Sequence, residues 1–255
     1  MRRFRNSIIR LAESLISVLP DSLWQPVTYV WFRVVSKRRP EEAMRRLLEV
    51  EEYLTRQINA VAIRYDDGIH VKHRLMRYHD FFVDRLRPGE RVLDIGCGVG
   101  AVANSMATRA EAVVTGVDIS RDNLATAKKH FRHPNLTFME GDVLQELPLG
   151  SYDTIVMSNV LEHFEGRAEF LKATQSRINP RRWLIRVPMI NRHWLVPMRQ
   201  ELGLPYFSDD THFVEYTQQS FEEEMQAAHM TITDLQINWG EIWAEVRSTE
   251  SVHGE

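Results

Sequence analysis

The chain has 255 residues, of which 44% are hydrophobic, so it is long enough for one α/β domain with an appendage and apolar enough to bury a sizeable core. Its net charge of −3 gives no overall basic character, which argues against a nucleic-acid partner. The single cysteine, Cys97, excludes an internal disulfide, so a reducing, cytoplasmic setting is expected.

Basic residues are concentrated at the N-terminal end. Residues 1–46 contain ten Lys and Arg residues and four acids, so the rest of the chain is net acidic. The basic residues flank apolar stretches at 15–19 and 27–35, and neither stretch approaches the roughly 20 residues that span a bilayer. Glu13 interrupts the start, which also lacks a clear signal-peptide cleavage site. We expect a helical cap with a solvated basic face; an interfacial helix on anionic lipid, which would make the protein membrane-associated, is the alternative.

The chain is predicted to consist of an N-terminal helical extension or lid, residues 1–72, and a catalytic domain, residues 73–255. Pro20, Pro26 and Pro40 should divide the first forty residues into short helices, because proline disrupts a helix interior. The extension would serve a dimer interface as readily as a lid.

Two further helices are predicted before the first strand. Apolar residues at helical spacing predict a helix over 41–62. A loop over 63–72 follows, and then a helix over 73–87 that Pro88-Gly89 stops.

Strands and helices alternate from residue 91 onward. Strands are predicted over 91–95, 112–118, 136–140, 152–158, 183–188, 231–237 and 241–247. Helices are predicted over 100–109, 120–131 and 166–178, and from Thr217 or Ser220 to about residue 229, while 189–216 are mostly irregular. Asn238-Trp239-Gly240 reads as a hairpin turn. The alternation predicts a doubly wound, mostly parallel sheet to which the terminal hairpin adds one antiparallel strand.

The most informative segment is 92–100, Val-Leu-Asp-Ile-Gly-Cys-Gly-Val-Gly, a short buried strand that runs into a glycine-rich turn. Glycine lets the backbone approach a ligand closely, and the following helix offers free N–H groups. Gly96-x-Gly98-x-x-Ala101 also fits a dinucleotide fingerprint. Asp94 distinguishes a dinucleotide from a cofactor that carries a cationic sulfonium amino acid. Its negative charge would attract that cation and repel a pyrophosphate.

Two later acids complete the pattern. Asp118 ends the second predicted strand, where a carboxylate accepts hydrogen bonds from a ribose diol. A dinucleotide enzyme would use the same acid, so Asp118 does not discriminate. Asp142 follows the third strand, where it can accept the exocyclic amine of adenine; its alternative role is that of a turn residue or helix cap.

Together these motifs resemble the class I SAM-dependent methyltransferases (SAM, S-adenosylmethionine) over about residues 75–247. The matching residues are 92–100, Asp118, Gly141-Asp142 and the fourth-strand segment 152–164. The resemblance implies a Rossmann-like, seven-stranded, mostly parallel sheet with the last strand antiparallel, and SAM as cofactor. The residues that it predicts to bind the cofactor are Asp94, Gly96, Cys97, Gly98, Gly100, Asp118, Ile119, Gly141, Asp142, Val143 and Asn159.

His163 is the first candidate for a catalytic base. It follows the fourth strand at the carboxyl edge of the sheet, where ligands bind in open α/β folds. Imidazole titrates near neutrality, so it can accept the proton of a hydroxyl nucleophile. Many members of the resembling family carry Leu-Glu-His here whatever their acceptor, so a structural role is the alternative.

His212 is the second candidate, as a base or a substrate contact. The segment 209–217 resembles the Asp-Pro-Thr-His segment that helps to close the acceptor pocket in small-molecule members of the family. Asp210 stands where those members have proline, so the turn is expected to differ, and we predict a substrate contact for it. A helix-entry turn capped by Thr217 is the alternative.

A polar cluster precedes the first strand. Arg74 and Tyr78 are predicted to bind the cofactor carboxylate or a polar acceptor, and a solvated polar face is the alternative. The acids and histidines at 162–163 and 209–212 fit no zinc spacing, so no metal ligand is assigned. A dependence on Mg²⁺, as in some O-methyltransferases, is a minor alternative.

The leading functional hypothesis is SAM-dependent O-methylation of a small polar acceptor. A sugar or a saccharide-linked lipid is preferred, because residues 189–216 are rich in His and Trp and the start of the chain is basic and amphipathic. The alternatives are an N-methyltransferase acting on a protein or amine, a non-catalytic SAM-binding module and an NAD-dependent oxidoreductase. Methylation of nucleic-acid amines is disfavoured, because residues 158–161 lack the Pro-Pro-aromatic step of those enzymes.

Overall fold

The computed structural model describes residues 20–249. The chain divides into two compact units, with the boundary between Ile58 and Asn59. What we predicted for the basic first nineteen residues lies outside the described part. The domain boundary at residues 72 and 73, and the role of the extension as a lid, stay predictions.

Two helices follow the start of the described chain: α2 (Asp21–Ser36) and α3 (Pro40–Tyr65), which continues past the unit boundary. The expected break at Pro26 is wrong, because α2 runs through this residue. A proline here removes one backbone hydrogen bond, and the apolar and aromatic residues on both sides continue the helix. Pro40 is the first residue of α3, a position at which proline's fixed φ suits a helix.

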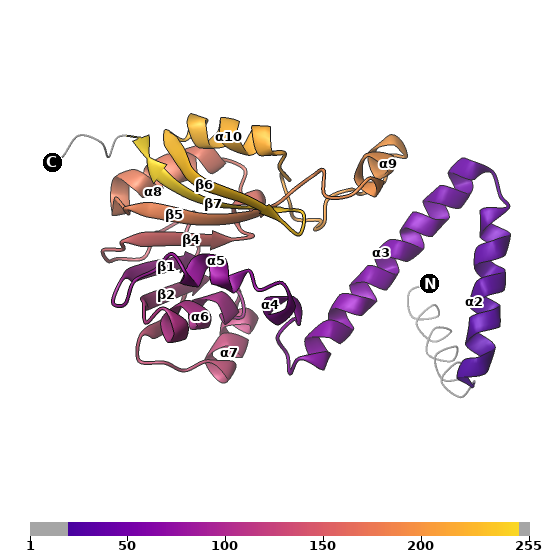
Figure 1. Ribbon diagram of the computed structural model, residues 1–255, viewed down its shortest axis with the longest axis horizontal. Helices are drawn as coiled ribbons and strands as arrows, with labels where there is room; N and C mark the ends of the chain where they lie inside the picture. The colour runs from indigo at the N-terminus through magenta and orange to yellow at the C-terminus, as the bar shows by residue number, and fades with distance from the viewer. Residues whose placement is uncertain (1–19, 250–255) are drawn as a thin grey trace. The chain divides into compact units, whose positions relative to one another are not determined.

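The second unit is built on a seven-stranded sheet in the order β3-β2-β1-β4-β5-β7-β6 (Figure 1). The strands are β1 (Arg91–Ile95), β2 (Val113–Asp118), β3 (Leu136–Glu140), β4 (Thr154–Ser158), β5 (Arg182–Pro188), β6 (Met230–Asn238) and β7 (Glu241–Ser248). Strands β1 to β5 pair in parallel, and β7 is antiparallel to both of its neighbours. The predicted fold class is therefore confirmed.

Helices cover the sheet on both faces, as expected for a doubly wound fold. They include α6 (Ala101–Arg109), α7 (Arg121–His130), α8 (Arg167–Ile178) and α10 (Gln218–Ala227). Leu93 belongs to one apolar cluster with side chains of α8 and α10, whereas its neighbour Val92 belongs to another with side chains of α6. Ser120 caps α7, and Thr217 forms a capping box with Ser220 at α10.

Two expectations about local structure need correction. The helix over 73–87 is instead two short helices, α4 (Lys72–Leu75) and α5 (His79–Val83), because Arg77 has a φ of 54° and turns the chain between them. Residues 189–216 are less irregular than expected, since they contain α9 (Leu195–Glu201).

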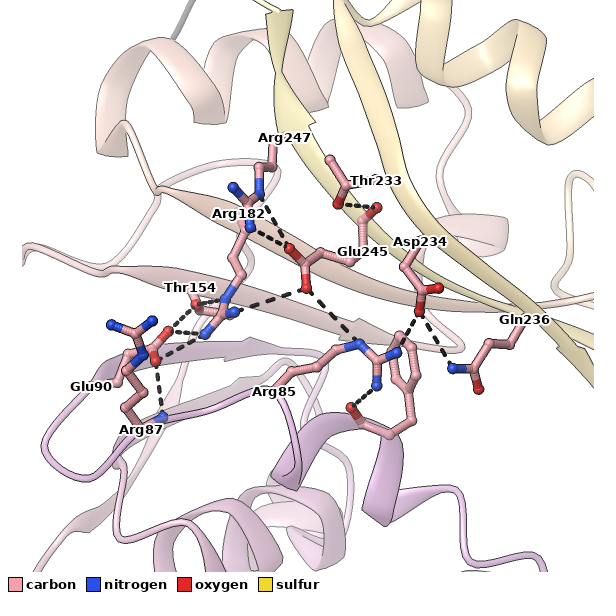
Figure 2. Close-up of polar contacts among 11 residues, drawn as sticks. Arg85, Arg87, Glu90, Thr154, Arg182, Thr233, Asp234, Gln236, Glu245 and Arg247 are labelled. Carbon is pink, nitrogen blue, oxygen red and sulfur yellow. Dashed lines mark hydrogen bonds and ion pairs between the residues drawn. The ribbon is translucent and has the colours of Figure 1, made fainter. Parts of the chain in front are cut away.

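A network of charged side chains crosses the edge of the sheet at which the parallel strands begin (Figure 2). Its main members are Arg85, Glu90, Thr154, Arg182, Asp234 and Glu245. Arg182 donates to both carboxylate oxygens of Glu90, at 2.7 and 2.9 Å, and to the Thr154 hydroxyl. Arg85 pairs with Asp234 and Glu245. The charges at this edge are therefore neutralised by each other.

No helix among residues 20–249 is both long enough and apolar enough to cross a membrane.

Candidate functional site

A cavity of about 670 Å³ opens at the opposite edge of the sheet, where β1, β2 and β4 end. Many of its lining residues follow directly from those strands or from β3. They include Asp94, Gly96, Cys97, Gly98, Asp118, Ile119, Gly141, Asp142, Val143 and Asn159, all of them predicted cofactor residues. The chain thus brings these segments, which are far apart in sequence, to one pocket.

The glycine turn after β1 has a backbone that other residues would strain. Gly96 has a φ of 65°, and a Cβ there would lie 2.5 Å from Val160. Gly98 has a φ of 54° and open space around it, so its backbone faces the cavity closely. Gly100 does not line the cavity; its φ is 78°, and a Cβ would lie 2.5 Å from Phe138. Gly100 therefore serves packing at the start of α6.

Asp118, at the end of β2, holds this turn in place. Its carboxylate accepts hydrogen bonds from the backbone N–H of Gly98 at 2.7 Å and of Ser120 at 2.8 Å. The side-chain amide of Asn123 also donates to it, at 3.4 Å. A carboxylate offers about four acceptor positions, so one remains for a ribose hydroxyl. Asp142 lies at the cavity wall, and one of its oxygens accepts the N–H of Leu144 at 3.0 Å, as in a turn.

Two buried acceptors in the cavity have no hydrogen-bond partner among the described residues: one carboxylate oxygen of Asp94 and the side-chain oxygen of Asn159. Asp94 lies in β1 and Asn159 directly follows β4, which pairs with β1. Burial, and secondarily the charge of Asp118, raises the pKa of Asp94 to about 8. An unsatisfied buried carboxyl is costly, so the arrangement suits a ligand that brings donors or a positive charge.

A cationic wall is formed by Lys72 and Arg186, which also line the cavity. Arg186 is 2% exposed, forms two hydrogen bonds with Glu241 and donates to Ser158 at 3.1 Å. Its guanidinium stacks 3.8 Å from the ring centre of Tyr78. Burial, followed by the charge of Arg186, lowers the pKa of Lys72.

His73 is part of the same wall and is linked to three polar side chains. Its Nδ1 lies 2.5 Å from the Tyr78 hydroxyl and 3.0 Å from Nε2 of His79, whose Nδ1 lies 2.8 Å from the Ser105 hydroxyl. Burial lowers the pKa of His73 to about 3 and that of His79 to about 4, so both rings are neutral at pH 7. If Nδ1 of His73 accepts from both neighbours, its Nε2 carries the proton and is a donor.

Next to the cofactor residues, a short helix η1 (Leu161–His163) follows β4 and carries His163 to the cavity wall. His212 does not line the cavity, but its ring packs against that of His163 with centres 4.6 Å apart. Burial, followed by the proximity of His212, lowers the pKa of His163. A neutral imidazole can accept a proton, so the placement suits a base.

Carboxylates and a hydroxyl orient the two rings. Nδ1 of His212 lies 3.1 Å from Glu215, so this ring donates to the carboxylate and turns Nε2 toward Glu162, 3.9 Å away. The Thr211 hydroxyl lies 2.9 Å from Nδ1 of His163 and donates to Asp209 at 2.6 Å. The orientation matches the carboxylate–histidine pairs that fix a tautomer in many enzymes.

Glu162 is fully buried, and neither of its carboxylate oxygens has a hydrogen-bond partner in the described chain. Burial raises its pKa to about 8. One ligand atom from each of Glu162, His163 and His212 can lie within 4.8 Å of the others. A carboxylate and two imidazoles form a set that suits a divalent transition-metal cation, so the residues fit one.

The remaining predicted residues lie differently. Tyr78 lines the cavity, but Arg74 does not: its side chain is 58% exposed and pairs with Asp66 at 3.0 Å. Asp210 is exposed and also lies outside the lining; its neighbour Asp209 is the acid connected to His163 through Thr211. The substrate-binding role assigned to Arg74 and Asp210 therefore gains no support from their placement.

Sequence reasoning missed three residues of the site: Lys72, Arg186 and Glu215. Arg186 left one signal, since it is a lone charge in the apolar run of β5. Glu162 was considered only among the acids and histidines at 162–163 and 209–212, to which no metal was assigned. Nothing local distinguished Lys72 or Glu215.

Comparison with known proteins places the chain in one family. A family described as "Methyltransferase domain" matches residues 68–235. A ubiquinone biosynthesis O-methyltransferase from Paracidovorax citrulli is 35% identical over 119 residues, which cover 44% of this chain and 49% of the relative. The mitochondrial ubiquinone biosynthesis O-methyltransferase of Saccharomyces cerevisiae is 34% identical over 42% of this chain and 35% of its own length. The chain thus spans half or less of these two relatives.

Solved structures agree on the fold. Magnesium protoporphyrin IX methyltransferase from Synechocystis PCC 6803, solved with bound SAH (S-adenosylhomocysteine), has a TM-score of 0.55 and 23% identity over 71% of this chain and 85% of its own. The cavity with its unsatisfied Asp94 fits the cofactor of such enzymes. The chain therefore belongs to the methyltransferase domain family, and its sheet has the fold of class I SAM-dependent methyltransferases.

Proposed function

We propose that the protein transfers a methyl group from SAM to a hydroxyl group of a small-molecule acceptor. One observation carries the choice of a hydroxyl: the cluster of Glu162, His163 and His212 at the end of β4, next to the cofactor residues. A hydroxyl must lose its proton as it attacks, so it needs a base or a cation nearby. A neutral amine can attack without one, which makes the cluster unnecessary for N-methylation.

In the proposed mechanism, the chain's own residues bind and orient the two reactants. When bound, SAM supplies an electrophilic methyl group on a sulfonium, with a neutral leaving group. Asp94 and Asn159 would accept hydrogen bonds from the ammonium of its methionine part, and Asp118 would accept one from the ribose diol. Orientation of the acceptor toward the methyl group supplies much of the acceleration.

The acceptor hydroxyl gives its proton to the nitrogen of His163 that faces the cavity, while the Thr211 hydroxyl holds the other ring nitrogen of His163. Glu215 orients the ring of His212, which packs against His163. If a divalent cation binds, Glu162, His163 and His212 hold it, and it polarises the acceptor oxygen and favours loss of its proton. In that case the two histidines act as ligands and the base is a different group.

For the acceptor we place first a hydroxyl on a ubiquinone-like ring, because the curated relatives cited above are named ubiquinone biosynthesis O-methyltransferases. A sugar or a saccharide-linked lipid comes second. That preference arose from the His- and Trp-rich segment 189–216, and its Trp194 is 62% exposed and does not line the cavity.

Transfer of a radiolabelled methyl group to a panel of catechols, simple phenols, glycans and amines tests the proposal. We expect label on a hydroxyl acceptor, and the catechols to lead. Each reaction is repeated with a chelator and then with added Zn²⁺, Mn²⁺ or Mg²⁺. If the chelator stops methyl transfer and the added cation restores it, a cation acts at the cluster. If the chelator leaves transfer unchanged, the base role falls to His163.

Label on amines or protein, with none on any hydroxyl, would replace this proposal with N-methylation. Binding of S-adenosylhomocysteine without transfer to any member of the panel would favour a non-catalytic SAM-binding module.

A further inference from the structure

Helix α2 exposes an apolar stripe that α3, the other described helix of its unit, does not cover. Its members lie at spacings of one, three and four residues, on one side of a helix. We define the stripe as Leu23, Val27, Val30, Trp31 and Val34. Each of them is between 41% and 60% exposed. Scattered apolar side chains on a surface are ordinary, but a contiguous stripe of this kind marks a site of interaction.

The chain turns strongly basic where α2 ends. Arg33, Lys37, Arg38 and Arg39 lie within seven residues, and all four are exposed. Arg38 pairs with Glu42. Over residues 1–39 the sequence contains eight Lys and Arg residues and two acids. Such a segment is attracted to surfaces that carry a negative charge.

The next helix shows that this combination is specific to α2. Helix α3 also exposes apolar side chains, such as Leu54 and Ile58. It contains five Glu residues and four Arg residues, however, so it lacks the positive charge. An apolar stripe and a cationic end occur together only in α2 among the helices of the first unit that the structure describes.

The length of α2 determines how it can meet a lipid bilayer. Its 16 residues correspond to a helix of about 24 Å, shorter than the roughly 30 Å of a hydrocarbon core. An amphipathic helix of this kind lies in the plane of the membrane surface, with its apolar side at the acyl boundary. Trp31 is a residue type that favours this boundary.

We propose that α2 is a membrane-surface helix that binds anionic phospholipid. The apolar stripe enters the boundary between headgroups and acyl chains, and Lys37, Arg38 and Arg39 contact the phosphates. Such contact would hold the pocket near acceptors dissolved in the membrane, which rests on the proposed function. The binding itself needs neither cofactor nor acceptor.

Flotation with lipid vesicles tests the proposal on the full chain. The protein is mixed with vesicles of phosphatidylcholine, or of phosphatidylcholine and phosphatidylglycerol, and the fraction that floats is measured. We expect flotation with the anionic vesicles and a decrease as salt is added, because ions screen the attraction.

Two pairs of variants separate the apolar and the charged contributions. Trp31→Ser with Val34→Ser removes part of the stripe, and its control is Ile237→Ser with Trp239→Ser, which alters exposed side chains at the β6–β7 turn. Lys37→Glu with Arg39→Glu reverses the charge, and its control is the same reversal at Lys128 and Lys129 on α7. Each α2 variant should weaken vesicle binding about tenfold or more, and neither control should.

Calorimetry with S-adenosylhomocysteine confirms that each variant still folds around its pocket. A full chain that stays in solution with anionic vesicles would overturn the proposal, as would α2 variants that float like the parent. Gel filtration covers a further outcome: a dimer that the stripe variant converts to a monomer would show that a second copy covers α2. Methyl transfer is measured separately, so a failed acceptor panel leaves the vesicle result standing.

Discussion

The two edges of the sheet differ in how completely their buried polar groups are paired. Where the parallel strands begin, Glu90, Arg182 and Glu245 neutralise one another, and Arg85 extends the network to Asp234 (Figure 2). Where the strands end, side-chain oxygens of Asp94, Asn159 and Glu162 are buried without a hydrogen-bond partner in the described chain. Such groups reduce stability, so their retention at one edge points to ligands that satisfy them.

The largest expected effect concerns catalysis at the strand ends. Replacing His163 with alanine should lower kcat by about 10²–10⁴-fold, because a base or a cation ligand is lost. Steady-state kinetics with the acceptor that the panel identifies measure the change. His130→Ala, which alters an exposed histidine of α7, is the control and should leave kcat unchanged. Equal rates in the two variants would make the histidine pair structural.

Cofactor affinity should depend on the unsatisfied carboxyl. Asp94→Asn keeps the shape of the side chain but cannot ionise to pair with the ammonium of the ligand, so the Kd of S-adenosylhomocysteine, measured by calorimetry, should rise about 10–100-fold. The unfolding free energy of the ligand-free variant should not fall, because the parent's buried carboxyl has no partner to lose. If Asp94→Asn lowered the unfolding free energy but left the Kd of S-adenosylhomocysteine unchanged, Asp94 would serve stability and not cofactor binding.

At the edge where the parallel strands begin, we expect a loss of stability without a loss of cofactor affinity. Glu90→Gln removes the charge that Arg182 and Thr154 contact, so the unfolding free energy should fall by about 1–3 kcal/mol. The Kd of S-adenosylhomocysteine should stay at the parental value. Urea denaturation and calorimetry give the two quantities, and a weakened cofactor affinity would contradict the separation of the edges.

Stability should also depend on pH through the strand ends. The pKa values of Asp94 and Glu162 are raised to about 8 by burial, so between pH 6.5 and 8 the folded protein retains protons that the unfolded chain has lost. The unfolding free energy should therefore fall as pH rises through this window. Below it, the lowered pKa values of His73 and His79 act in the opposite direction.

The variant Asp94→Asn isolates one of these carboxyls. Urea denaturation from pH 6.5 to 8 should give a flatter slope for Asp94→Asn than for the parent. A parental slope in this variant would show that Asp94 is ionised in the folded protein.

A smaller effect separates two neighbours in the chain. Lys72 lines the cavity and Arg74 does not, so Lys72→Ala should weaken cofactor or acceptor binding about two- to fivefold and Arg74→Ala should leave it unchanged. Calorimetry and KM values supply the comparison. If Arg74→Ala weakened binding and Lys72→Ala did not, Arg74 would regain the binding role that the sequence predicted for it.

The sequence predicted what local patterns determine. The buried strands, the turn after β1 and the cap at Ser120 each depend on residues close together, and the cofactor pocket follows from where parallel strands end. Most of the predicted cofactor residues accordingly line the cavity.

What the sequence could not predict depends on tertiary contacts. Arg77 adopts a left-handed φ where the helical pattern continued, beside Tyr78, which is 1% exposed. His212 meets His163 because the segment after β5 is tied back to η1, through the N–H of Phe213 and the carbonyl of Glu162 at 2.9 Å. Such anchoring joins residues about fifty positions apart, and no short-range pattern reveals it.

The position of β7 has a consequence for how the protein folds. This strand lies between β5 and β6, although it follows both along the chain. Until β7 has paired, β5 keeps one open edge and β6 has no neighbour in the sheet. Open strand edges invite pairing with other chains, so a folding intermediate without β7 would be more prone to aggregation than the finished sheet.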